Sequence, residues 1–337
     1  GFVLAHVYQD KFSETLSSRD YLHFLGLRLA RLYPVHLVSF LAALAFAVLS
    51  RTLGNATASL SSVDALVHLS LLHAWGPGNY GTYNLVSWAI SAEWFAYLFL
   101  AVPFIRYLRR MPLAFLYTLT ATAWGILVFA YVPHTPSQLV NMTYQFGIFR
   151  IAPEFLGGYV AYRTIQALPV NRLLYGFASI LGLAGVLVVT HYTSLQVLLL
   201  PSIMLLIVGL SAEGPVSKRL CGNRLALWLG ERSYSLYMSH FIVLWVVDAV
   251  FKRSSLPHTL WTGLFFTGIY FVVALITTIL LYAWVERPCR SAGRDALDTL
   301  LSRKSPDLTV SPHRLLRLNI SPKKRATADT AKRTDNA

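Results

Sequence analysis

Long hydrophobic stretches separated by short polar segments make up most of the chain. A transmembrane helix needs about 20 mainly apolar residues, and the pattern gives about eight full spans plus the remnant of a helix at residues 1–9. The stretch around 64–75 is too short to cross a bilayer and predicts a re-entrant or surface segment. We therefore predict an all-α fold, a polytopic transmembrane helical bundle. The predicted spans are residues 34–51, 86–105, 113–132, 145–162, 174–191, 194–210, 227–248 and 259–284.

The composition supports a membrane protein. Of the 337 residues, 55% are hydrophobic and 13% are charged, with a mean hydropathy of +0.52, whereas about a quarter of the residues of a soluble domain are charged. The net charge of +14 does not indicate nucleic-acid binding, because +7 of it lies in the polar segment 287–337. We divide the chain into a membrane domain at 1–286 and a basic tail at 287–337, whose Ser, Pro, Lys and Arg content predicts disorder.

Lys and Arg are distributed unequally between the alternate loops. Twelve lie in one set of loops, and only Arg51, Lys252 and Arg253 lie in the other. Loops rich in Lys and Arg face the cytoplasm, so the first set and the basic tail are predicted to be cytoplasmic.

The sequence carries no signature of a disulfide framework or a metal site. Cys221 and Cys289 lie beside basic clusters, and we interpret both as unreactive thiols. The histidines show no metal-ligand spacing; His68 and His73 are five residues apart and are not predicted to form a site.

A carboxylate interrupts the predicted span at 86–105, in the stretch SWAISAEWFAY. Glu93 lies in the first half of that span, Tyr97 follows one helical turn later, and Ser87 and Ser91 lie on the adjoining arc. An ionisable residue inside a membrane is costly and by default indicates a functional site that faces the protein interior. The alternative is that Glu93 lies in the wet interface and pairs with a neighbour.

Two further groups of polar side chains lie within predicted spans. Arg150 and Glu154 are four residues apart on one helical face, where they either neutralise each other or point together at a substrate. Ser233, Tyr237 and His240 recur on one face of a later helix. An intramembrane histidine can act as an acid, a base or a hydrogen-bond partner, and the alternative is a simple helix contact.

Arg28 and Arg31 share a face at the cytoplasmic end of the 34–51 span. They are either ordinary positive anchors of the topology or a forked contact to phosphate groups, which the planar guanidinium group suits.

Five segments of the chain together resemble the signature segments of a known enzyme family. They are LRLARLYPVH, SWAISAEWFAYLFLAVP, APEFLGGYVAYR, LGERSYSLYMSHFIVLW and WVERPCR. Their order and spacing are similar to those of the acyltransferase-3 family, from residue 1 to about 290. Members of this family are membrane O-acyltransferases that modify O-antigen, nodulation factor and exopolysaccharide.

The resemblance implies transfer of an acyl group, usually acetyl from acetyl-CoA, to a hydroxyl of a cell-surface or exported carbohydrate. The expected partners are acyl-CoA as donor substrate, a carbohydrate or lipid-linked glycan as acceptor, and membrane lipids. No nucleic acid, metal or tightly bound cofactor is expected. The expected location is a bacterial inner membrane, crossed several times, with the C-terminal tail in the cytoplasm.

The motif matches and the polar positions above give the candidate site residues. In the family, the first helix carries an Arg followed by a His taken to be the general base. This chain begins at residues similar to the second helix, so the base is expected upstream of Gly1. The candidate CoA-binding residues are Arg28 and Arg31, the candidate catalytic residues are Ser91, Glu93, Tyr97 and His240, and the candidate substrate-binding residues are Ser87, Arg150, Glu154 and Tyr237.

The alternative function is that of a carrier or flippase for a lipid-linked sugar. Such a protein would use the same polar spans and need no acyl donor. The sequence shows no pair of corresponding broken helices in two halves, which inverted-repeat transporters have.

Overall fold

The chain folds into helices throughout the part that the structure describes. The computed structural model describes residues 1–12, 17–53, 61–76, 83–131, 143, 145–169, 171–211, 215–257 and 259–301. The α-helices are α1 (Phe2–Phe12), α2 (Ser18–Thr52), α3 (Ser62–Leu69), α4 (Trp88–Phe95), α5 (Ala101–Tyr107), α6 (Leu113–Tyr131), α7 (Gly147–Ala167), α8 (Arg172–His191), α9 (Leu199–Ser211), α10 (Pro215–Cys221), α11 (Arg224–Arg253), α12 (Leu260–Leu281) and α13 (Arg287–Leu300). They are joined by the 3-10 turns η1 (Leu85–Ser87), η3 (Leu108–Arg110) and η4 (Thr193–Leu198) and by the π-helical turns η2 (Ala96–Leu100) and η5 (Tyr282–Glu286).

Seven helical segments within the described residues are long and apolar enough to cross a membrane, which confirms the prediction of a polytopic helical bundle. Helix α7, at the position of the predicted span 145–162, has 21 residues but also carries Arg150, Glu154 and Arg163. Its crossing of the membrane stays a prediction. The seven segments are Ser18–Thr52, Leu85–Arg110, Leu113–Ala130, Arg172–His191, Ser194–Ser211, Arg224–Arg253 and Leu260–Leu300.

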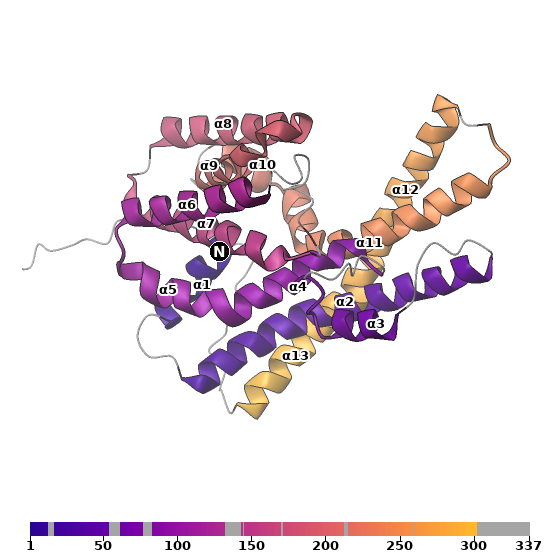
Figure 1. Cartoon of the computed structure of the whole chain (residues 1–337), viewed down its shortest axis with the longest axis horizontal. Helices are drawn as coiled ribbons and strands as arrows, with labels where there is room; N and C mark the ends of the chain where they lie inside the picture. Colours follow the sequence, from indigo (N-terminus) through magenta and orange to yellow (C-terminus); the bar gives the residue numbers. More distant parts are fainter. Residues whose placement is uncertain are drawn as a thin grey trace, which may run out of the picture.

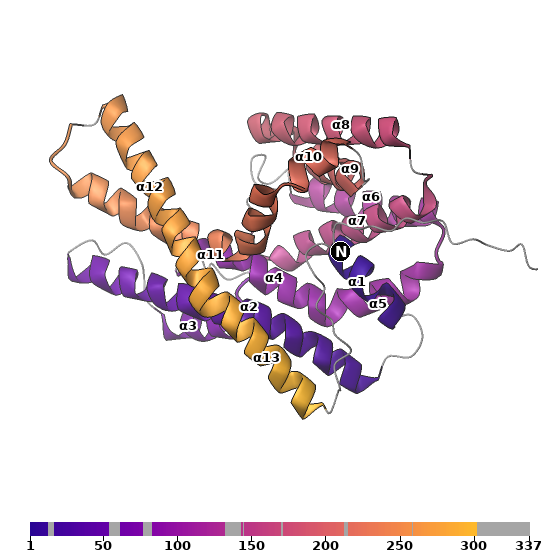
Figure 2. The ribbon, with the colours of Figure 1, turned by 180° about the vertical axis from the view of Figure 1, so that it is seen from behind.

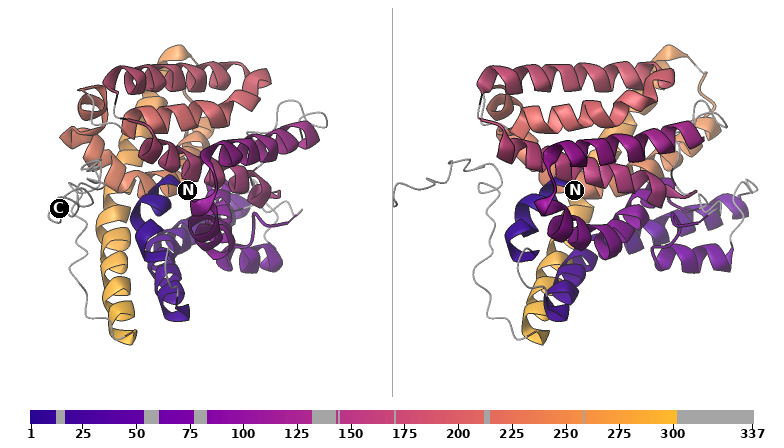
Figure 3. Two further views of the ribbon diagram at one scale, coloured as in Figure 1. Left: turned by 90° about the vertical axis from the view of Figure 1, so that its left-hand side faces the viewer. Right: turned by 60° about the vertical axis from the view of Figure 1, so that its left-hand side comes forward.

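The helices form a stack around a central group. Helices α8 and α9 lie at one side of the molecule, α2 and α13 lie at the other, and α1, α4, α5 and α7 lie between them (Figures 1 and 3). Helix α12, η5 and α13 form one long helix, which runs beside α11 and then beside α2 (Figure 2).

Helix α2 begins much earlier than the sequence pattern predicted. The apolar run starts at residue 34, but the helix starts at Ser18, where the Ser17 hydroxyl accepts a hydrogen bond from Asp20 N at 3.1 Å. Pro34 lies inside the helix without ending it. Arg28 and Arg31 therefore lie within the helix, where they flank the central core.

Residues Arg287–Leu300, which the sequence pattern placed at the start of a disordered tail, form the ordered helix α13. The segment continues the helix of α12 and η5, and it packs along the first part of α2. His23 Nε2 of α2 lies 2.9 Å from Asp298 Oδ1 of α13. The polar composition of this segment suggested disorder. The segment is helical because it packs against α2. Residues 302–337 of the predicted tail lie outside the described residues.

The predicted short segment around 64–75 forms α3, which has eight residues, and a loop that we call the 70–76 loop. Helix α3 lies beside α2 (Figure 1). The loop turns back at Leu71, whose φ of 58° is left-handed, and then contacts α4.

The close packing of α8 on α9 depends on glycine. A Cβ at Gly182 of α8 would lie 2.4 Å from Leu206 N, and one at Gly209 of α9 would lie 2.3 Å from Ser179 N. Small residues let transmembrane helices approach closely, so this pair can associate by backbone contact.

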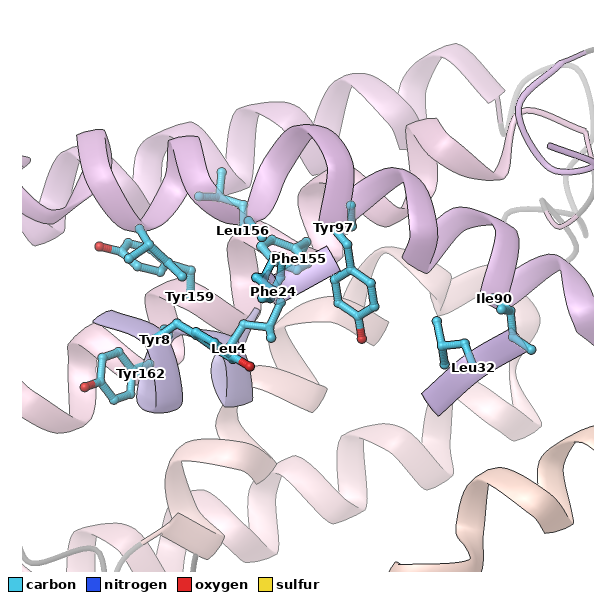
Figure 4. Packing of buried hydrophobic residues seen from close by; sticks show 14 of the residues in the cluster. Leu4, Tyr8, Phe24, Leu32, Ile90, Tyr97, Phe155, Leu156, Tyr159 and Tyr162 are labelled. Carbon is cyan, nitrogen blue, oxygen red and sulfur yellow. The ribbon is translucent and has the colours of Figure 1, made fainter. Parts of the chain in front are cut away.

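The largest buried apolar cluster lies among α1, α2, α4, η2 and α7. Tyr97 lies between Phe24 on one side and Leu32 and Ile90 on the other (Figure 4). The rings of Phe24 and Tyr97 are 5.9 Å apart in an edge-to-face arrangement. This cluster surrounds the polar groups described next.

Candidate functional site

Glu93 and Tyr97 form a pair at the junction of α4 and η2. The Tyr97 hydroxyl donates a hydrogen bond to Glu93 Oε1. Tyr97 is buried, with 5% of its surface exposed, and Glu93 is half-buried. The sequence predicted that Tyr97 lies one helical turn beyond Glu93, and the structure brings the two side chains together.

Arg28 lies in an aromatic cage next to this pair. Its guanidinium carbon is 5.1 Å from the centre of the Tyr8 ring, 5.4 Å from that of Phe24 and 5.5 Å from that of Tyr97. Cation–π contacts of this kind hold a guanidinium group without using its hydrogen-bond donors. The Arg28 side chain is thus oriented by its face.

Arg31 follows one turn later on the same helix. Both Arg28 and Arg31 lie within electrostatic range of Tyr97. Among the described residues, the Nε atoms of the two arginines are buried and have no hydrogen-bond partner. A buried donor without an acceptor is costly, which makes the two arginines candidates for binding an anion.

A second carboxylate, which the sequence analysis did not select, faces the same region. Glu286, in η5, is only 1% exposed, and its Oε2 accepts a hydrogen bond from the Ser235 hydroxyl at 2.5 Å. It lies within electrostatic range of Arg31. Tyr234, next to Ser235 on α11, donates from its hydroxyl to Leu32 O at 2.5 Å and so ties α11 to α2. The motif WVERPCR contains Glu286, and the rule applied to Glu93 would have found it.

Arg150 and Glu154 form the predicted ion pair on α7. Arg150 Nε lies 2.8 Å from Glu154 Oε1. The Arg150 guanidinium also lies over the ring of Trp88, at 5.1 Å from its centre, which links α7 to the start of α4. Both Arg150 and Glu93 are within electrostatic range of Tyr237 on α11.

Tyr237 and His240 line a groove between α11 and α12. The groove has a volume of about 600 Å³. His240 Nδ1 lies 2.7 Å from Tyr237 O, which orients the imidazole ring. The predicted common face of Ser233, Tyr237 and His240 is confirmed, because all three line the groove. The remaining lining residues are Leu236, Tyr270, Phe271, Ala274 and Leu275.

Ser87 and Ser91 are fully buried and contact neighbouring parts of the chain. The Ser91 hydroxyl donates to Leu71 O at 2.7 Å and accepts from Ala74 N at 3.0 Å. The Ser87 hydroxyl donates to Asn84 O at 2.7 Å. Both serines therefore lie near Glu93 in the sequence but bind protein groups.

Three histidines gather beside Ser87, which the sequence spacing did not predict. The rings of His36 and His73 are 5.8 Å apart and those of His68 and His73 are 4.1 Å apart, both pairs stacked. Burial and the neighbouring histidines lower the pKa of His73 well below its usual value. In the part of the chain that the structure describes, no group of three His, Cys, Asp or Glu side chains could hold a metal ion.

A comparison with protein families matches this architecture to known proteins. A family model described as an acyltransferase domain matches residues 1–283, which is most of the chain. The chain belongs to the acyltransferase-3 family. No curated protein and no solved structure matched it significantly. With its apolar spans, it is therefore a multi-pass membrane acyltransferase.

The predicted site residues of the acyltransferase fall into four places. Arg28, Arg31, Glu93 and Tyr97 lie together in the core, where Glu286 and Tyr234 join them. The second place is the Arg150–Glu154 pair on α7 and the third is the groove at Tyr237 and His240; they lie beside this core cluster. Ser87 and Ser91 form the fourth place and face the opposite direction, toward the 70–76 loop, so the prediction that they lie on the arc adjoining Glu93 is wrong.

Proposed function

We propose that this membrane acyltransferase moves an acyl group, acetyl in the simplest case, from acyl-CoA to a hydroxyl of a cell-surface or exported carbohydrate. The observation that carries the proposal is the pair of arginines with unpartnered, buried Nε atoms beside the Glu93–Tyr97 pair. It supports a role for the two arginines in binding an anion next to a carboxylate that would orient a base or a hydroxyl. An acyl transfer from a phosphate-bearing donor needs both functions.

The donor is acyl-CoA, whose phosphates are the anionic groups that Arg28 and Arg31 would bind. The two guanidinium groups lie one helical turn apart, and a guanidinium group can make two parallel hydrogen bonds to phosphate. The aromatic cage fixes Arg28 in place beforehand, which lowers the entropy cost of binding.

The chemistry is nucleophilic attack by the acceptor hydroxyl on the thioester carbonyl. A general base takes the hydroxyl proton, the oxygen forms the new ester bond, and the carbon–sulfur bond breaks to release the CoA thiolate, which is then protonated. Glu93 is positioned to orient the base or the acceptor.

The acceptor is proposed to bind near Arg150, Tyr237 and His240. The groove beside Tyr237 and His240 is mainly apolar, with a polar edge, and it is open to the surroundings of α11 and α12. A lipid-linked glycan has a hydrocarbon part and a polar part that would suit these two surfaces. His240→Ala should then raise KM for the acceptor and leave KM for acetyl-CoA nearly unchanged.

Labelled acetyl-CoA tests the proposal directly. Bacterial membranes that contain the complete protein should transfer radiolabelled acetyl to the membrane glycan fraction, and the Arg28→Lys variant should do so at a reduced rate at low donor concentration. Transport of a lipid-linked sugar without any use of acetyl-CoA would instead support a carrier. Reporters fused near residues 110 and 300 should both read cytoplasmic, because the Lys- and Arg-rich loops lie on that side; if they do not, the proposed inner-membrane topology is wrong.

A further inference from the structure

The 70–76 loop contacts several helices that carry the proposed site. Ser91 of α4 binds its backbone at Leu71 O and Ala74 N. Trp75 Nε1 donates to Ser91 O at 3.0 Å. The hydroxyl and the backbone carbonyl of Ser91 therefore make three hydrogen bonds to the loop. Ser91 lies two residues before Glu93.

The same loop is attached to the start of α7. Ile148 N donates to Ala74 O at 3.4 Å, and Phe146 N donates to Gly76 O at 3.1 Å. The loop packs closely on the start of α7 at Gly147, because a Cβ there would lie 3.3 Å from both Ala74 Cβ and the Trp88 ring. The loop therefore also fixes the end of α7 that carries Arg150.

His73 connects the loop to the start of α4. Its Nε2 lies 3.0 Å from Ser87 Oγ. Because the single hydroxyl proton of Ser87 is donated to Asn84 O, the Nε2–H of His73 is the donor in this contact. Asn84 in turn donates from Nδ2 to Met238 O of α11 at 2.9 Å. His73, Ser87 and Asn84 thus form a buried path from the loop to α11.

Helix α2 completes the arrangement through His36. Its Nε2 lies 2.9 Å from His68 O, at the end of α3, and its ring stacks on that of His73. His36 and His73 are each 1% exposed. His36 lies two turns beyond Arg28, on the same helix. The loop therefore contacts the helices that carry the proposed CoA site, the Glu93–Tyr97 pair and the Arg150–Glu154 ion pair, and it is linked to α11 through Ser87 and Asn84.

We propose that His73, Ser87 and Ser91 are positioning residues, which hold α4 against the 70–76 loop and so set the place of Glu93 relative to Arg28 and Arg31. This inference rests on the proposed acyl transfer for its activity readout. It assigns Ser87 and Ser91 a role toward the loop and none toward substrate. All three side chains are buried, and within the described residues each one hydrogen-bonds to another part of the protein.

The test compares His73→Gln with His73→Leu in the complete protein. Gln keeps an amide that can hydrogen-bond Ser87, whereas Leu fills similar space without a donor. We expect His73→Leu to lower kcat by at least about 10-fold, because a misplacement of the site residues by about 1 Å is enough for such a loss. KM for acetyl-CoA should stay within about twofold, and the pH profile should be unchanged. We expect Gln to restore kcat to within about threefold. Ser70→Ala is the matched control, since the Ser70 hydroxyl binds Leu66 O within its own turn.

A distance measurement separates this inference from the proposed reaction. Spin labels at Leu41 of α2 and Tyr107 of α5, both exposed, report the separation of the two helices after Cys221 and Cys289 are replaced by Ser. The Leu variant should broaden or shift this distance, and the Gln variant should match the wild type. If Leu changes neither kcat nor the distance, or lowers kcat at an unchanged distance, positioning is refuted. If wild type transfers no acetyl group while the distances behave as expected, the proposed reaction fails and the positioning stands.

Discussion

Replacing Glu93 by Gln tests the centre of the proposed site. The amide is nearly the same size as the carboxylate and can still accept the hydrogen bond from Tyr97, so the fold should be retained. What changes is the negative charge. A hydrogen bond to a charged group contributes about 1.5–3 kcal/mol and a neutral one about 0.5–1.5 kcal/mol. The weakened bond alone therefore accounts for about a 10-fold change.

The larger effect comes from the base or acceptor that Glu93 orients. Loss of general-base assistance lowers a rate by about 10²–10⁴-fold. We therefore expect Glu93→Gln to lower acetyl transfer by at least about 100-fold. Tyr97→Phe removes the same hydrogen bond but keeps the charge, so a loss of about 10-fold is expected. The double variant should be no worse than Glu93→Gln alone, because both changes act on one interaction.

The assay is acetyl transferred per folded molecule, with folding checked by size-exclusion chromatography of the detergent-solubilised protein. Glu231→Gln is the matched control, because Glu231 is an exposed carboxylate on α11 that pairs with the adjacent Arg232, at 3.4 Å. Full activity of Glu93→Gln would refute the proposed role of the charge. Loss of folded protein in Glu93→Gln, with normal activity of the molecules that fold, would make Glu93 a structural residue.

Three further predictions follow from the same structure. Arg28→Lys and Arg31→Lys should each raise KM for acetyl-CoA by about 10-fold, because Lys cannot make a forked contact to phosphate; an unchanged KM in both would make them topology signals. Gly182→Ala should lower the free energy of unfolding by about 1–3 kcal/mol through a clash with α9, whereas Gly268→Ala, with open space around it, should not, and equal melting temperatures would contradict this. Because the pKa of His73 is lowered in the folded chain, the unfolded chain takes up a proton below about pH 6.5 that the folded chain does not. The stability should therefore fall as the pH decreases below that value, and His73→Gln should reduce the fall.

The local pairs of the site could be predicted from the sequence. Glu93 with Tyr97 and Arg150 with Glu154 are each four residues apart, and a helix brings such residues together whatever surrounds it. The shared groove of Tyr237 and His240 follows from the same helical periodicity. These predictions needed only the correct assignment of a helix.

The contacts of the 70–76 loop could not be predicted in this way. His36 and His73 stack although 37 positions separate them in the sequence, and Ser91 binds a backbone carbonyl 20 residues earlier. Serine and histidine spacing carries no information about such distant partners. The apolar run also gave the wrong start for α2, because Arg28 and Arg31 interrupt the hydrophobicity of a helix whose polar face is directed at the core.

The two π-helical turns make the length of the chain itself part of the site. η2 contains Tyr97, and η5 contains Glu286. A π-turn holds one residue more than an α-helical turn, and it accommodates that residue by widening locally, so the helix on either side keeps its direction. Deleting one residue from Ala96–Leu100 would therefore restore a regular turn at Tyr97, while Ala101 and Ile105, both buried, stay directed at the core. In relatives of this protein, a gap of a single residue at either turn should change the local position of Tyr97 or Glu286 without turning the rest of the helix.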